Sequence, residues 1–220
     1  MGESSTCNII LNDINLVNYT LKTFQDIFNF QINEIKTIDD WPWENECEID
    51  YSQISKSIEI NKIVMIYGTS EGYNLGLFIH KVDNCLSVSF WINNLPTSIL
   101  YNEKFTNIIV HFLSTSKVEW IMNGAEIEIP ENISFCNTLK CNDGMIAYWV
   151  CKKNTVIHNN KDYMIIETED TNYKIGICED FTDYSSCKNN DFKPIWNNVK
   201  KDIISKRNLK DILDYLNNLS

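Results

Sequence analysis

Residues 73–94 are YNLGLFIHKVDNCLSVSFWINN, and this stretch carries the clearest structural pattern of the chain. Apolar and polar residues alternate with a period of two on both sides of residues 82–84, Val-Asp-Asn. Such alternation is typical of paired antiparallel strands with one face in a core. Because Asp and Asn favour tight turns, residues 82–84 are expected to join the two strands. The sequence therefore predicts a β-hairpin here.

Further elements are predicted from the spacing of apolar residues along the rest of the chain. Helical spacing occurs at 13–28, 101–113, 194–204 and 208–219, with Asp13 and Asn208 as N-caps. Strand-type runs occur at 62–67, 118–129, 145–152, 155–158, 163–168 and 172–178. This order predicts an α+β fold, in which about four helices pack against an antiparallel sheet of hairpins and a meander.

The length of 220 residues suits a single compact domain over 1–220. Long flexible linkers are not expected, because the chain has only 7 Gly and 4 Pro. A helix followed by a series of strands occurs twice. This leaves open a pseudo-repeat of residues 1–97 and 98–180, followed by C-terminal helices at 193–219.

The formal net charge is −11, and it is concentrated in the first half of the chain. Residues 1–100 carry 5 Lys against 13 Asp and Glu, a net charge of −8. A negative field repels nucleic acid and anionic lipid and attracts basic partners. Arg207 is the single arginine, so the bidentate groups that recognise phosphate are nearly absent. We therefore expect a basic protein partner and no direct contact with nucleic acid or membrane.

Residues 1–15 have no basic segment followed by a long apolar run, so no signal peptide is predicted. No run of about 18 apolar residues predicts a transmembrane helix either. The eight cysteines belong to a long, core-rich chain, which favours reduced thiols over a disulfide framework. These features predict a cytoplasmic protein.

Catalytic and cofactor motifs are absent from the sequence. The glycines at 68–76 lack the Lys-Ser/Thr ending of a phosphate-binding loop and suit a hairpin turn. His80, His111 and His158 lie on polar faces or beside a turn, without a partner nearby in sequence. The Cys136–Cys141 pair has no second ligand pair for zinc. We expect no catalytic residues, no metal and no cofactor.

The stretch DDWPWENECEID, residues 39–50, holds six carboxylates and no Lys or Arg. Its odd positions from 41 to 49 are Trp, Trp, Asn, Cys and Ile, and its even positions from 44 to 50 are all acidic. This parity predicts a strand with one apolar and one acidic face, and Pro42 confines it to a sheet edge. Carboxylates on one face lie about 6.5–7 Å apart, which is too far to converge on one small ion. The interpretations left are an edge protected from aggregation and a protein-binding surface.

A protein-binding surface would use tryptophan as an anchor and carboxylates to steer a basic partner. The predicted partner-binding residues are Trp41, Trp43, Glu44, Glu46, Glu48 and Asp50. The parity places both tryptophans on the inward face with Cys47 and Ile49, whereas Pro42 can break it. Whether Trp41 or Trp43 is exposed is left open by the sequence.

The stretches 39–50 and 73–94, in an acidic chain without catalytic motifs, resemble at class level the small acidic immunity proteins that accompany bacterial polymorphic toxins. The resemblance implies a non-catalytic cytosolic inhibitor that neutralises a cognate basic toxin, for example a nuclease, by steric occlusion. Two alternatives stay open. One is a hydrolase with dispersed Cys, His and carboxylate residues, and the other is a viral or phage protein that binds a host factor.

Overall fold

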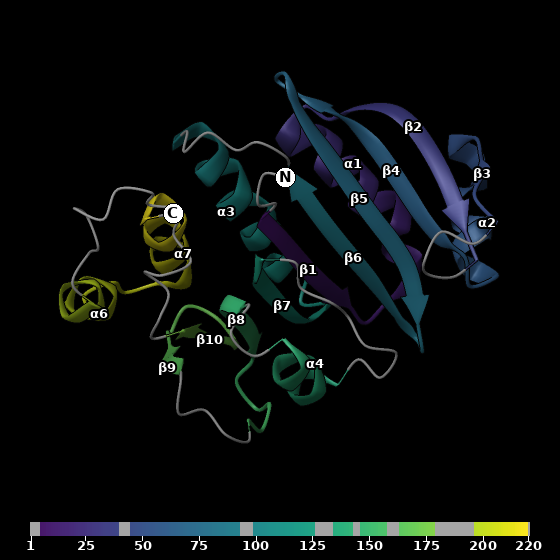
Figure 1. Cartoon of the computed structure of the whole chain (residues 1–220). Helices are drawn as coiled ribbons and strands as arrows, with labels where there is room; N and C mark the ends of the chain where they lie inside the picture. The colour runs from purple at the N-terminus through teal and green to yellow at the C-terminus, as the bar shows by residue number, and fades with distance from the viewer. Residues whose placement is uncertain are drawn as a thin grey trace.

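The computed structural model describes residues 5–39, 45–92, 99–125, 134–142, 146–157, 163–178 and 196–219. These residues form an α+β fold in which helices pack against one antiparallel sheet (Figure 1), as the sequence predicts. No helix of this described part is both long and apolar enough to cross a bilayer.

Ten strands of the described part form the sheet, and each of them is antiparallel to its neighbours. They are β1 (Ser5–Leu11), β2 (Gln31–Ile38), β3 (Cys47–Glu48), β4 (Ile63–Ser70), β5 (Tyr73–Val82), β6 (Cys85–Ile92), β7 (Val118–Ala125), β8 (Ile146–Lys152), β9 (Tyr163–Glu167) and β10 (Tyr173–Cys178). Their spatial order is β3-β2-β4-β5-β6-β1-β7-β8-β10-β9. The first strand of the chain therefore lies in the middle of the sheet, between two groups of later strands.

The described part has six α-helices, two more than the sequence predicts. They are α1 (Val17–Phe28), α2 (Ile54–Glu59), α3 (Ile99–Ser114), α4 (Phe135–Cys141), α6 (Trp196–Ile204) and α7 (Leu209–Leu219), and two short 3-10 helices, η1 (Ile14–Leu16) and η2 (Tyr51–Gln53), precede α1 and α2. The sequence does not predict α2 and α4, because six or seven residues are too few for a clear apolar periodicity.

The predicted hairpin of residues 73–94 is confirmed over its described residues, 73–92, as β5 and β6. Leu77 pairs with Phe90 and Ile79 with Val88, so these four residues share the buried face that the alternation predicts. Asp83 in the turn has a φ of 53°, a left-handed conformation that Asp tolerates better than most residues.

One face of the sheet is covered by α1, α2, α3 and α7, with α6 packed onto the same core. Phe90 of β6 lies at the centre of this layer, with ring centroids 5.0 Å from Phe24 of α1 and 4.9 Å from Phe105 of α3. Figure 1 shows α1 crossing behind β4, β5 and β6. Fully burying such aromatic side chains stabilises the fold by about 1.5–3 kcal/mol each.

A buried polar chain attaches α7 to this layer. Tyr148 of β8 donates its hydroxyl hydrogen to Asn217 Oδ1 of α7 over 3.1 Å. Asn217 Nδ2 in turn donates to Thr106 Oγ1 of α3 over 2.8 Å. Burial raises the pKa of Tyr148 well above its usual value, so the hydroxyl stays a donor. The chain orients α7 on α3 and β8.

The opposite face carries α4 over the second group of strands. Phe135 of α4 packs edge-on against Trp149 of β8, with centroids 5.2 Å apart and an interplanar angle of 78°. The Trp120 ring of β7 packs against the same Phe135 ring, with centroids 6.3 Å apart. Ile10, Met122, Ile146, Leu139 and Cys151 complete this smaller core.

The predicted caps are present, with small differences. Asp13 accepts a hydrogen bond from the Asn15 N–H over 3.0 Å, but it caps η1, and α1 begins only at Val17. Asn208 Oδ1 accepts from the Asp211 N–H over 2.8 Å at the start of α7. The Asp211 carboxylate accepts from Asn208 Nδ2 at 2.9 Å, a side-chain contact in place of the backbone contact of a capping box.

Several predicted strand boundaries are wrong. Residues 155–157 lie outside any strand, and of the described residues in the edge strand predicted over 39–50, only the two of β3 are in a strand. β1 and β2 are not predicted as strands. β1 lies in mid-sheet with residues such as Asn8 and Ile10 buried on the second face, so its sequence does not show the alternation of a half-exposed strand.

Candidate protein-binding surface

The described part of the predicted partner-binding stretch, residues 45–50, lies at one edge of the sheet. β3 pairs with β2 through Thr37–Cys47 and Lys36–Glu48, and it is the outermost strand on that side. Glu46, Glu48 and Asp50 are exposed. Trp41, Trp43 and Glu44 lie outside the described residues, so their role in binding a partner stays a prediction.

The parity predicted for this stretch is wrong at Cys47, which is exposed instead of buried. Ile49 follows the prediction in part, since it is half-buried against the main core. The cause is the shortness of the pairing. β3 is held to β2 over only two residues and has no neighbouring strand on its outer side, so the Cys47 side chain is left exposed.

Glu46 already has a partner within the chain. Lys36 Nζ on β2 lies 2.6 Å from Glu46 Oε1 and 2.9 Å from Glu34 Oε1. The hydrogen bonds to Glu46 and then Glu34 raise the pKa of Lys36 above its usual value. The three side chains together carry one net negative charge, so Glu46 contributes to the field as part of a cluster.

Asp50 also has a structural role. Its side chain accepts from the Gln53 N–H, while Gln53 Oε1 accepts from the Asp50 N–H over 2.9 Å. This capping box begins η2 and the helical segment that leads into α2. Glu48 has no ion-pair partner among the described residues and is the most available of the three described carboxylates of the predicted set.

Two exposed apolar side chains flank α2 next to these carboxylates. Tyr51 is 45% exposed and Ile60 is 59% exposed. Glu59 is exposed between them in the chain. We call the surface formed by Glu46, Glu48, Asp50, Tyr51, Glu59 and Ile60 the acidic edge. The sequence does not single out Tyr51 and Ile60, because their exposure depends on how the short helix α2 packs on β4 and β5.

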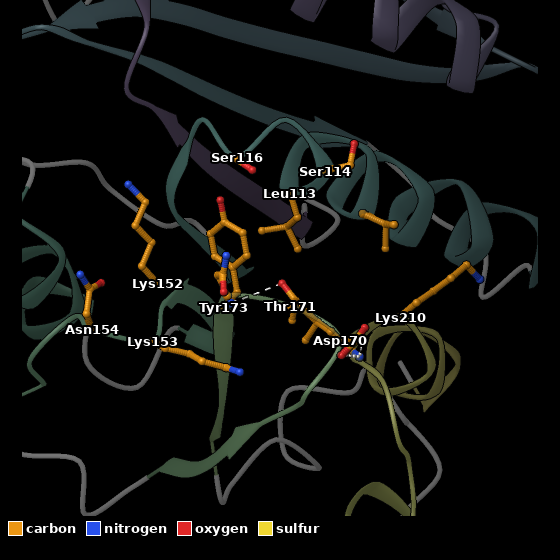
Figure 2. Close-up of a pocket in the computed structure, with 13 residues that line it drawn as sticks. Leu113, Ser114, Ser116, Lys152, Lys153, Asn154, Asp170, Thr171, Tyr173 and Lys210 are labelled. Carbon is orange, nitrogen blue, oxygen red and sulfur yellow. Dashed lines mark hydrogen bonds between the residues drawn. The ribbon is translucent and has the colours of Figure 1, made fainter.

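A cavity of about 670 Å³ lies at the other end of the fold, between the end of α3, the turn after β8, the turn before β10 and the start of α7 (Figure 2). Val110, Leu113, Tyr173 and Leu209 form its apolar lining, and Lys152, Lys153, Asp170 and Lys210 its charged lining. Figure 2 shows the Lys152 and Lys210 side chains on opposite sides of the cavity, pointing away from each other.

Each charged group of this lining has a partner in the chain. Two of the lysines form ion pairs: Lys152 Nζ lies 2.6 Å from Glu119 Oε1, and Lys210 Nζ lies 2.7 Å from Asp214 Oδ2. The other two groups bind the backbone. Lys153 Nζ donates to Thr168 O over 2.6 Å, and the Asp170 carboxylate accepts from the Leu209 N–H at 3.3 Å. Among the described residues, the lining has no cysteine or histidine and no serine paired with a base. Nothing in it resembles a nucleophile with a general base.

The described histidines do not form a catalytic arrangement either. His111 Nε2 lies 2.6 Å from the Tyr19 hydroxyl, and the two rings stack with centroids 5.5 Å apart. His80 is largely buried, which lowers its pKa to about 4, and its Nδ1 has no hydrogen-bond partner. Within the described ranges, no histidine is hydrogen-bonded to a cysteine or carboxylate. His158 lies outside them.

The described cysteines and carboxylates do not cluster as metal ligands do. No group of three or more His, Cys, Asp or Glu side chains in the described part could hold a metal ion. Cys136 donates to Val156 O over 3.3 Å, and Cys141 is exposed, so the C-x4-C pair has no complete ligand set around it.

No protein-family model matches the chain, and no curated protein is similar to it at a significant level.

Proposed function

We propose that the chain is a non-catalytic cytosolic binding protein that neutralises a basic protein, in the manner of an immunity or inhibitor protein. The observation that carries the proposal is the acidic edge. Four carboxylates and two exposed apolar side chains share one end of the sheet, in a chain whose net charge is −11. Such a combination suits a basic partner that buries apolar area.

The mechanism is steric occlusion assisted by charge. The field of the acidic edge raises the rate of encounter with a basic surface, and this effect weakens as salt screens the charges. Tyr51 and Ile60 then supply the apolar contact that slows dissociation, because tyrosine is a frequent anchor in interfaces. A toxin of nuclease type is a fitting partner, since its substrate site is basic.

The test mixes the protein with the product of the neighbouring gene and measures complex formation, association rate and protection of cells. Charge reversal of Glu48 and Glu59 together should lower the association rate by about tenfold at low salt and flatten its salt dependence. Both residues are exposed, and among the described contacts neither caps a helix as Asp50 does. Charge reversal of Glu167 and Glu169, two exposed carboxylates at the end of β9 and in the turn after it, changes the net charge equally and is the matched control.

The absence of any complex with that neighbour, with toxicity undiminished, would overturn the inhibitor proposal. A complex that forms at an unchanged rate in the Glu48/Glu59 variant would place the interface away from the acidic edge.

A further inference from the structure

One cross-strand row on the sheet face opposite α1 combines a carboxylate with two aromatic rings. Glu34 of β2 lies opposite Tyr67 of β4, Tyr67 lies opposite Gly76 of β5, and Gly76 lies opposite Trp91 of β6. Directly opposed residues in antiparallel strands point to the same face. We call Glu34, Tyr67 and Trp91 the acid–aromatic strip.

Gly76 allows the Trp91 indole to lie across the sheet. A Cβ atom at residue 76 would meet Trp91 Cζ2 at 2.3 Å and Cε2 at 2.4 Å, closer than any real contact. The indole therefore occupies the space that a side chain would fill, with one ring face against β5. Trp91 is only partly buried, which leaves part of the ring accessible.

Tyr67 forms a second aromatic wall next to this indole. The two ring centroids are 6.1 Å apart, with an interplanar angle of 59°. Tyr67 is also only partly buried. Desolvation raises the pKa of its phenol, so the ring stays neutral at physiological pH. Two tilted neutral rings present the negative faces of their π systems to a nearby cation.

The carboxylates beside Tyr67 add a net negative charge. Glu34 and Glu46 share the single ammonium group of Lys36, and all three groups act electrostatically on the Tyr67 phenol. Glu34 and Glu46 keep about two-fifths of their side-chain surface exposed. An incoming cation thus meets both carboxylate oxygens and aromatic faces, whereas an anion would be repelled.

We infer that the basic partner places an arginine side chain on the acid–aromatic strip. A guanidinium is planar, so it can stack on Trp91 or Tyr67 while its N–H groups donate to Glu34. A lysine ammonium is more strongly hydrated and cannot stack, so it fits this site less well. The inference rests on the proposed function and specifies the chemistry that the partner presents at this face.

The test uses a hexa-arginine peptide amide as the probe, with a hexalysine amide for comparison. Binding is followed by calorimetry and by the NMR signal of the Trp91 indole N–H, assigned with Trp91→Phe. The arginine peptide should shift this signal and bind severalfold more tightly than the lysine peptide. Trp91→Ala and Glu34→Gln should each weaken arginine binding by about threefold to tenfold.

Two controls keep the result interpretable. Glu169→Gln removes an exposed carboxylate far from the strip and should leave the affinity unchanged. Glu34→Gln keeps the size of a partly exposed side chain, and Lys36 keeps its ion pair with Glu46, so its result stands even where Trp91→Ala fails to fold. An unshifted Trp91 signal, or equal affinities for the two peptides and all variants, would overturn the inference.

The outcome is separable from that of the inhibitor proposal. A complex with the neighbouring gene product that is insensitive to Trp91 and Glu34 would overturn the arginine site and leave the inhibitor proposal standing. Arginine-peptide binding at Trp91 without any complex with the neighbour would support the site and overturn the inhibitor proposal.

Discussion

Two tryptophans lie across two glycines on the same face of the sheet, and their surroundings differ. Trp149 of β8 covers Gly176 of β10, where an added Cβ would meet its Cζ2 at 2.0 Å. Trp91 covers Gly76 in the same way, with its Cζ2 at 2.3 Å. Trp149 is fully buried, whereas Trp91 is partly exposed.

The cross-strand registers place both rings on one face. Trp149 lies opposite Met122, Met122 opposite Asn8, and Asn8 opposite Ser89, two residues before Trp91 on β6. The difference between the sites is α4, whose Phe135 packs edge-on against Trp149. The same local arrangement therefore becomes core where a helix covers it and an accessible aromatic platform where the ring stays partly exposed.

The largest effect is expected from Phe135→Ala. Phe135 is 6% exposed and contacts both Trp149 and Trp120, so its truncation should cost about 3–5 kcal/mol in free energy of unfolding. Tyr67→Ala, the matched change beside Trp91, should cost about 1–2 kcal/mol because Tyr67 is only partly buried. Urea unfolding measures both, and similar costs would refute the difference between the two sites.

The second-largest expected effect is a pH dependence of the free energy of unfolding. It arises from His80, which lies on the same face of the sheet as Trp91. Burial lowers the pKa of His80 on β5 to about 4, while in the unfolded chain it is near 6.5. Between these two pKa values the unfolded state therefore binds more protons than the folded state. The contribution of His80 to the free energy of unfolding is full above about pH 6.5 and falls by about 3 kcal/mol towards pH 4.

Unfolding free energies measured at pH 7 and at pH 4.5 test this dependence. His80→Asn should flatten the change over that interval, because the substituted side chain does not titrate. Asp13 and Asp39 have pKa values lowered from 3.8, so their titration lies below this window. An equally steep change in the variant would assign the pH dependence to another group.

The smallest effect is expected from the two glycines themselves. Gly176→Ala forces a buried indole and the helix above it to shift, at a cost of about 1–3 kcal/mol. Gly76→Ala should cost less than about 1 kcal/mol, because the partly exposed Trp91 is less confined than the fully buried Trp149. Thermal unfolding of both variants measures these losses of stability. A loss for Gly76→Ala as large as that for Gly176→Ala would mean that Trp91 is as confined as Trp149.

Local patterns predicted the elements that depend on local chemistry. The alternation at 73–94 predicted β5 and β6, apolar spacing predicted α1, α3 and α7, and Asp13 and Asn208 were predicted as caps. These signals act over a few residues, through side-chain periodicity and hydrogen bonds to the nearest N–H groups.

Long-range pairing was beyond local patterns. β1 begins the chain, yet it pairs with β6 and β7, which lie far from it in sequence. Nothing within Ser5–Leu11 specifies those partners, because strand pairing is decided by which buried faces match across the whole sheet. The exposure of Cys47 is also beyond local patterns, because it depends on the short pairing of β3 at the outer edge of the sheet.

For the candidate surface too, the sequence determined some features and the tertiary structure decided others. Acidity and the exposure of Glu46, Glu48 and Asp50 follow from sequence alone, because closely spaced carboxylates cannot be buried without partners. The tertiary structure decided that Glu46 shares Lys36 with Glu34, and that Glu34, Tyr67 and Trp91 lie in one row. Glu34, Tyr67 and Trp91 come from three strands, and only the strand order and register bring their side chains to one place.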